Sequence, residues 1–146
     1  MSKRTKSTSK KKEKKLSYYI KKLDIAFSKY IRVKHAGTNG FCRCISCGKM
    51  YHWTKIQNGH YMSRRYYSTR FSEDNCRPQC VACNIFEHGN ILLYRENLIR
   101  EIGEERVESV QFRARNDTKR WSAWELEQLE KYYKALTEKI RNEKGI

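Results

Sequence analysis

Long hydrophobic runs are absent from the sequence. Hydrophobic residues make up 38% of the 146 residues, and charged residues interrupt the apolar stretches. Because a membrane-spanning helix needs about 20 consecutive apolar residues, the sequence predicts no membrane span. An apolar segment is also missing after the basic N-terminus, so we expect no secretory signal and a cytoplasmic location.

Acidic residues are scarce relative to basic ones. The chain has 32 Lys and Arg but only 16 Asp and Glu, which gives a formal net charge of +16. Solubility requires much less charge in a chain of this size, so the excess predicts a polyanionic partner. The length fits one domain and the sequence has no internal repeats, so we expect a single core.

Apolar residues are nearly absent from residues 1–15, where eight Lys or Arg and one Glu are interspersed with Ser and Thr. This segment cannot join a packed core, so we predict a disordered basic tail at residues 1–15 and one folded domain at residues 16–146. The tail either contacts nucleic acid or only aids solubility, and both alternatives predict disorder without a ligand.

Apolar residues recur every three or four positions in several segments, which is typical of helices with one buried face. Ser122 and Glu125 have the spacing of a capping box, which starts the last of these helices. A shorter helix is expected to begin within the second C-x-x-C pair, and a metal knuckle followed by a β-hairpin is expected between Phe41 and Phe71. The longer helices are predicted at residues 16–34, 91–102, 104–114 and 122–143.

Disulfides are not expected in a reducing compartment, so metal binding explains the six cysteines better. Two C-x-x-C pairs can hold Zn²⁺ tetrahedrally in a closed site that stabilises the fold and has no open position for chemistry. Cys42 or Cys76 can replace a neighbouring ligand, although neither forms another C-x-x-C pair. The predicted structural zinc ligands are Cys44, Cys47, Cys80 and Cys83.

Four polar residues lie between and after these pairs in an order that resembles the zinc-bearing HNH nucleases: His60, Asn75, Asn84 and His88. The resemblance implies an α+β fold with a zinc-stabilised ββα-metal core, a β-hairpin followed by a helix that holds one divalent metal. We expect the helices at the two ends of the chain to flank this core.

The residue types suit phosphodiester hydrolysis. An imidazole has a pKa near neutrality, so His60 is the candidate general base. Asn84 and His88 are spaced i and i+4, so on a helix they would face the same side and hold a catalytic metal ion, which neutralises charge on the phosphate. Asn75 is expected to pin the loop that carries His60.

Gly59 departs from the HNH pattern, because many HNH nucleases carry an Asp ligand directly before the base histidine. Water, phosphate oxygens, His88, Glu87 or Asp74 are the candidates to complete the metal shell.

Further motifs are spread over the chain at Phe27–Arg32, Cys44–Lys49, Gly59–Arg64, Arg70–Phe71, Asn75, Gln79–Asn84 and Gly89–Asn90. Together they resemble one family in particular, the NinG or Rap recombination endonucleases of lambdoid phages, over roughly residues 16–142. The resemblance implies a nuclease that cuts branched DNA such as Holliday junctions with Mg²⁺ or Mn²⁺, in the host cytoplasm.

Basic and aromatic residues are interspersed just after His60. Arg64, Arg65 and Arg70 are expected to pair with DNA phosphates, which fixes a strand without reading its sequence. Tyr66 and Tyr67 either stack on unpaired bases at a branch or pack within the hairpin.

Three functions remain open on these residues. The first is a metal-dependent endonuclease selective for branched DNA, the second is a general or nicking HNH endonuclease, and the third is a catalytically dead, zinc-stabilised DNA-binding module. Resolving a four-way junction requires two cuts. This requirement favours a homodimer, because a C2 pair presents one site to each strand. The apolar stripes of helices 16–34 and 122–143 either form that dimer interface or pack on each other within one chain.

Overall fold

Helix α1 (Leu16–Lys34) begins and ends at the residues that the apolar periodicity predicts. The computed structural model describes residues 13–146. The predicted disorder of the basic tail therefore falls almost entirely on residues outside the described part of the chain. Helix α1 buries the stripe that contains Leu23, Phe27 and Ile31.

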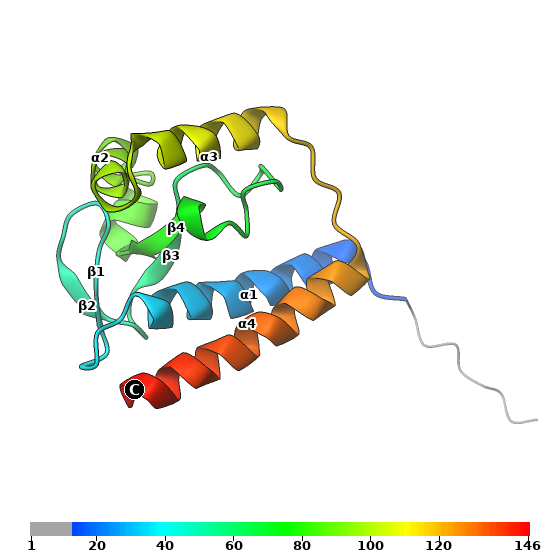
Figure 1. Ribbon diagram of the computed structural model, residues 1–146, viewed down its shortest axis with the longest axis horizontal. Coiled ribbons are helices and arrows are strands. Elements are labelled where there is room, and N and C mark those ends of the chain that lie inside the picture. Colours follow the sequence, from blue (N-terminus) through cyan, green and yellow to red (C-terminus); the bar gives the residue numbers. More distant parts are fainter. Residues whose placement is uncertain (1–12) are drawn as a thin grey trace, which may run out of the picture.

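Helix α4 (Ala123–Lys144) lies beside α1 and runs in the same direction (Figure 1). The predicted capping box is confirmed, because the Ser122 side chain accepts from the Glu125 N–H and the Glu125 carboxylate accepts from the Ser122 N–H. The rings of Phe27 and Tyr133 pack edge to face between the two helices, with centroids 4.9 Å apart. Of the two alternatives for the apolar stripes, packing within one chain is the one observed.

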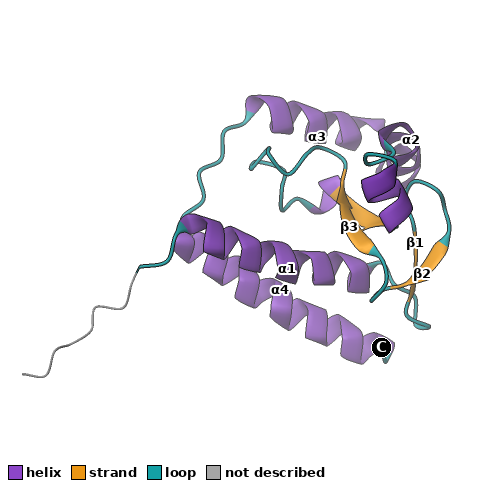
Figure 2. Ribbon diagram, turned by 180° about the vertical axis from the view of Figure 1, so that it is seen from behind, coloured by secondary structure: helices purple, strands orange, loops and turns teal. Residues whose placement is uncertain are grey.

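Two antiparallel strand pairs complete the fold, one between this helix pair and a second helical layer and the other at the end of these layers (Figure 2). Strands β1 (Phe41–Arg43) and β2 (Met50–His52) form a hairpin around the first cysteine pair. Strand β3 (Gln57–His60) pairs with β4 (Cys76–Gln79), so that His60 lies opposite Cys76.

The predicted C-terminal boundary of the β-hairpin that follows the metal knuckle was wrong. The partner of β3 lies beyond Phe71, because the intervening residues 61–75 form a long loop that ends in a 3-10 turn, η1 (Glu73–Asn75). This loop is anchored at both ends by packing. Phe71 packs against α1 and α4, whereas Tyr61 and Met62 pack in a second core.

The short helix after β4 is confirmed, but residues Ala82–Phe86 (η2) form a π-helix rather than an α-helix. Its wider turn is closed by a hydrogen bond from the Glu87 N–H to the Ala82 carbonyl at 2.8 Å. The helix does not continue to His88, whose backbone has a positive φ of 49°.

The second helical layer consists of α2 (Ile91–Ile102) and α3 (Glu104–Asn116). The first has the predicted bounds, and the second extends two residues beyond its predicted end. Their core buries Tyr94, Leu98 and Val107 together with Tyr61 and Met62 from the loop after β3. None of the helices within residues 13–146 is long and apolar enough to cross a membrane.

Candidate functional site

The four predicted zinc ligands converge at one point next to the β1–β2 hairpin. The sulfur atoms of Cys44, Cys47, Cys80 and Cys83 all lie within 4.8 Å of one another, and those of Cys47 and Cys80 are 3.8 Å apart. Thiolates that bind Zn²⁺ tetrahedrally at about 2.3 Å have sulfurs about 3.8 Å apart. The cluster can therefore bind a zinc ion.

Cys42 and Cys76 lie outside this cluster, which removes both alternative ligands. The Cys42 thiol donates to the carbonyl of Arg32 at 3.1 Å, and burial raises its pKa to about 11. Cys76 is fully buried in the core against α1, where burial raises the pKa of its thiol as well. Neither sulfur belongs to the group of four that converges on one point.

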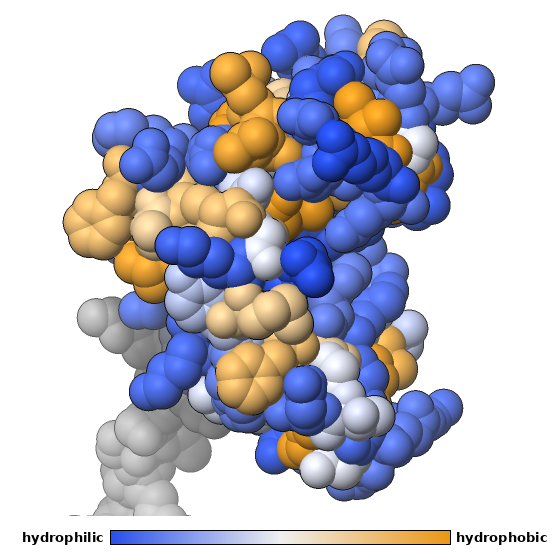
Figure 3. Space-filling model, turned by 90° about the vertical axis from the view of Figure 1, so that its left-hand side faces the viewer, coloured by the Kyte–Doolittle hydropathy of each residue, from blue (hydrophilic) through white to orange (hydrophobic). Residues whose placement is uncertain are grey.

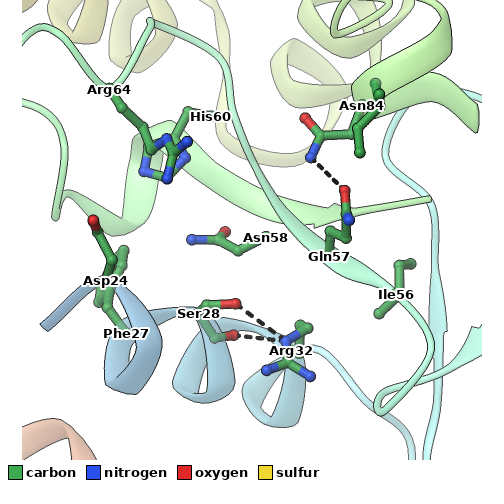
Figure 4. A pocket seen from close by; sticks show the side chains of 11 residues that line it. Asp24, Phe27, Ser28, Arg32, Ile56, Gln57, Asn58, His60, Arg64 and Asn84 are labelled. Atoms are coloured by element: carbon green, nitrogen blue, oxygen red, sulfur yellow. Dashed lines mark hydrogen bonds between the residues drawn. The ribbon is translucent and has the colours of Figure 1, made fainter. Parts of the chain in front are cut away.

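A second candidate site is a hollow of about 650 Å³ between α1, strand β3 and the π-helix. The close-up in Figure 4 shows that α1 and β3 form two of its walls. Three predicted site residues meet here, His60, Arg64 and Asn84, and residues that belong to no predicted site complete the lining. These are Asp24, Phe27, Ser28, Arg32, Ile56, Gln57, Asn58 and Ile85.

His60 has a defined tautomer in this pocket. Its Nε2 lies 2.8 Å from the carbonyl oxygen of Arg70, and a carbonyl only accepts, so Nε2 carries the proton and Nδ1 has the lone pair. The pKa of His60 is lowered to about 4, mainly by burial and also by the charge of Arg64, against the opposing effects of the hydrogen bond to the Arg70 carbonyl and of the Asp24 charge. The imidazole is therefore neutral at neutral pH and able to accept a proton.

The low pKa of His60 predicts how stability depends on pH. Burial also lowers the pKa of His35 to about 4, whereas an imidazole in the unfolded chain titrates near 6.5. Between about pH 6.5 and pH 4 the unfolded chain therefore binds more protons, and the free energy of unfolding falls as the pH is lowered, by up to about 3 kcal/mol for each group.

Urea unfolding of the wild type and of His60→Gln at pH 7 and pH 5 tests this expectation. The variant should lose less stability than the wild type on acidification, whereas His88→Gln, at an exposed position, should follow the wild type. Equal losses in wild type and His60→Gln would show that His60 titrates normally.

Asn75 is fully buried and holds the two ends of the loop after His60 together. Its Oδ1 accepts from the Met62 N–H at 2.7 Å, and its Nδ2 donates to the carbonyls of Met62 and Thr69 at 3.0 and 3.1 Å. The side chain does not line the pocket, so it positions the loop rather than meeting a ligand.

Asn84 and His88 do not share a helix face, which corrects the predicted pair of metal ligands. Asn84 lines the pocket, and its Nδ2 donates to Gln57 Oε1 at 2.8 Å. The π-helix ends at Phe86, and the turn that follows leaves His88 exposed and away from the pocket lining. The i and i+4 rule failed because it assumes α-helical geometry through residue 88.

The three predicted DNA-binding arginines have different surroundings. Arg64 lines the pocket, and Arg65 is exposed with its Nη2 2.7 Å from the hydroxyl of Tyr66. Arg70 instead donates from Nε and Nη2 to both carboxylate oxygens of Asp24 at 2.9 and 2.5 Å, and from Nη1 to the Arg64 carbonyl. Arg70 is therefore engaged inside the protein, which corrects its assignment as a phosphate contact.

The acid of the pocket is Asp24, which was not among the expected metal-shell residues. Asp74 pairs with Arg106 instead, and neither Asp74 nor Glu87 lines the pocket. A signal for Asp24 was present, because it is the only acidic residue in the segment 16–34. It also precedes two further pocket residues, Ser28 and Arg32, at helical intervals of four.

Gly59 cannot be replaced by an Asp ligand in this fold. A Cβ atom at this position would lie 2.2 Å from Gln79 Oε1 and 2.7 Å from its Cβ. Successive side chains of a strand point to opposite faces, so a residue at position 59 would point away from His60 and from the pocket.

Comparison with known proteins identifies relatives of the chain. The family described as "Bacteriophage Lambda NinG protein" matches residues 1–143. Proteins named ninG from Escherichia phages 933W and lambda are each 32% identical over 132 residues, and that of Salmonella phage P22 is 30% identical over the same length.

The alignments cover 88% of this chain but only 61%, 60% and 61% of those three relatives, so the chain spans about three fifths of their length. No solved structure matches the chain. Because the family match runs over nearly the whole sequence, this chain belongs to the family of the bacteriophage lambda NinG protein.

Proposed function

We propose that the chain is a metal-dependent DNA endonuclease of the HNH type that acts on branched DNA, such as Holliday junctions. The observation that carries the proposal is a neutral imidazole with a fixed tautomer, His60, in a pocket that also contains arginines. An antiparallel strand pair followed by a short helix around this pocket supports the same proposal, because this is the order of elements that the HNH resemblance implies.

The residues of the chain divide the work in this mechanism. His60 Nδ1 takes a proton from the attacking water, and the Arg70 carbonyl holds the ring in the required tautomer. Arg64 binds the phosphate. Asn75 fixes the loop that runs from His60 through Arg64 to β4. His60 is neutral at working pH, which is the form that takes a proton.

The pocket fits a hard divalent cation such as Mg²⁺ or Mn²⁺. Asn58 Oδ1 is buried and has no hydrogen-bond partner among residues 13–146, and oxygen atoms of this kind are the ligands such ions prefer. Asn58 and Asn84 are the residues that would hold it, in place of the His88 expected from sequence, whereas both oxygens of Asp24 accept from Arg70. When bound, the ion would neutralise charge that develops on the phosphate.

The junction preference is tested with purified protein on an end-labelled four-way junction and on a duplex of the same sequence, in Mg²⁺ and in EDTA. We expect Mg²⁺-dependent cuts near the branch point and little cutting of the duplex. Equal cutting of both substrates would identify a general or nicking endonuclease.

One observation favours a different function, a DNA-binding module without activity. The acid of the pocket, Asp24, is neutralised by Arg70, and the strand position before His60 has no room for an acidic ligand. Binding of the junction without any cut in Mg²⁺ or Mn²⁺ would establish this alternative.

The basic tail, residues 1–15, is proposed to strengthen DNA binding without choosing the substrate. Its deletion removes eight basic residues and one acidic residue. The slope of log affinity against log salt should then flatten, by up to about 0.9 for each phosphate that the tail neutralises. Titrations of one junction at several salt concentrations measure this slope. An unchanged slope would mean that the tail serves solubility alone.

Two copies of the chain are proposed to act on one junction, since one pocket cuts one strand at a time. The stripes of α1 and α4 are used within the chain, so the dimer requires another surface. On the face in Figure 3, hydrophobic side chains lie in small groups between hydrophilic ones. Analytical ultracentrifugation of the junction complex should give two chains per junction. One chain per junction, with uncoupled nicks, would contradict the proposal.

A further inference from the structure

One face of α1 presents a row of polar side chains to the pocket. Asp24, Ser28 and Arg32 follow one another at intervals of four residues, and all three line the hollow across from β3 (Figure 4). Asp24 is already neutralised by Arg70, whose side chain is only 15% exposed. The remaining charge on this row is the guanidinium of Arg32.

Arg32 is held in place by neutral acceptors only. Its Nε lies 3.1 Å from the Ser28 carbonyl oxygen and 3.3 Å from Ser28 Oγ, and its Nη1 donates to the Trp53 carbonyl at 2.8 Å. No carboxylate within residues 13–146 forms an ion pair with it, and its Nη2 has no hydrogen-bond partner in that part of the chain.

Burial of the Arg32 guanidinium without an anionic partner costs free energy. A partly buried cation loses hydration, and burial lowers the pKa of Arg32 as a result. Other cations contrast with it. Arg32 and Lys29 both lie over the Trp53 ring, but Lys29 pairs with Glu138. Arg100, on the surface of α2, pairs with Glu96. Arg32 therefore has the properties of a binding residue whose counter-ion is a ligand.

We propose that Arg32 binds a phosphate of the DNA strand in the His60 pocket. The inference rests on the proposed function, in which this pocket receives a phosphodiester. The Nη2 of the guanidinium is free to donate to phosphate oxygens, while the hydrogen bonds of Nε and Nη1 fix the rotamer and so reduce the entropy cost of binding. Arg64 follows β3 whereas Arg32 comes from α1, so the two arginines bind the strand from different elements.

The test is a binding measurement on a background that does not cut DNA, His60→Ala. Fluorescence anisotropy with a labelled four-way junction compares Arg32→Gln with the matched control Arg100→Gln. We expect Arg32→Gln to weaken binding about 10- to 100-fold and to flatten the salt slope by about 0.9, the value for one phosphate that is no longer neutralised. Arg100→Gln should change neither. Equal binding and equal slopes in both variants would overturn the inference.

A second measurement covers the case in which Arg32→Gln does not fold, which zinc content and circular dichroism will reveal. Inorganic phosphate should raise the thermal midpoint of the wild type relative to chloride at equal ionic strength, and Arg32→Lys should lose most of this shift because an ammonium lacks the planar fork. A shift that is the same in wild type and Arg32→Lys would overturn the inference. A protein that binds DNA through Arg32 but never cuts would contradict only the proposed function.

Discussion

Replacement of Cys80 by Ser is expected to unfold the centre of the chain. Cys80 follows β4 directly, and its backbone N–H donates to the sulfur of Cys44 at 3.3 Å, so it joins the two halves of the cluster. Structural zinc sites contribute about 10–16 kcal/mol of apparent binding free energy at neutral pH, more than the whole stability of many domains. Loss of one ligand therefore removes more stability than the small strand pairs can supply.

The measurement is zinc content together with urea unfolding followed by circular dichroism. Cys42→Ser is the matched control, because Cys42 is a buried thiol outside the cluster and a serine hydroxyl can also donate to the Arg32 carbonyl. The control should keep zinc and most of its stability. A zinc-free Cys80→Ser protein with the unfolding midpoint of the wild type would show that the cluster has no structural role.

His60→Ala is expected to abolish cleavage and leave junction binding intact. Removal of a general base typically costs about 10²- to 10⁴-fold in rate. The backbone around residue 60 should hold, because Asn75 fastens the following loop through its own hydrogen bonds and β3 pairs with β4 regardless of the side chain.

His88→Ala is the control for this prediction. The sequence pattern suggests His88 as a metal ligand, but the residue lies outside the pocket lining, so the variant should cut at the wild-type rate. A large loss of cleavage in His88→Ala with normal cleavage in His60→Ala would move the site to the turn after the π-helix.

The helices could be predicted from the sequence almost to the residue, because their signals are local. Apolar side chains at three- and four-residue spacing define α1, and Ser122 with Glu125 marks the start of α4. The cluster of four cysteines was equally predictable, since each C-x-x-C pair brings two sulfurs together through its own short turn. Which helices would pack on each other was left open, because an apolar stripe does not specify its partner.

The pocket was only partly predictable, because its walls come from distant parts of the sequence. His60 and Asn84 follow a recognisable order in the sequence. Asp24 is held at the pocket by its ion pair with Arg70, which lies 46 positions away in the sequence. The π-helix at Ala82–Phe86 widens one turn, and no residue pattern indicated it. In the sequence, Gly59 stands where many HNH nucleases carry a metal ligand. In the structure, the close approach of Gln79 shows that a side chain at position 59 would face the core side of the strand pair.

We propose that the His60 pocket hydrolyses DNA. The most direct measurement is a single-turnover assay, with protein in excess over a labelled four-way junction and zinc content verified beforehand. Mg²⁺ is added to start the reaction, and wild type and His60→Ala are compared under conditions in which both bind all of the junction. We expect cut strands from the wild type in Mg²⁺, none in EDTA, and none from His60→Ala. An uncut junction fully bound by the zinc-loaded wild type in both Mg²⁺ and Mn²⁺, or equal rates for wild type and variant, would contradict the claim.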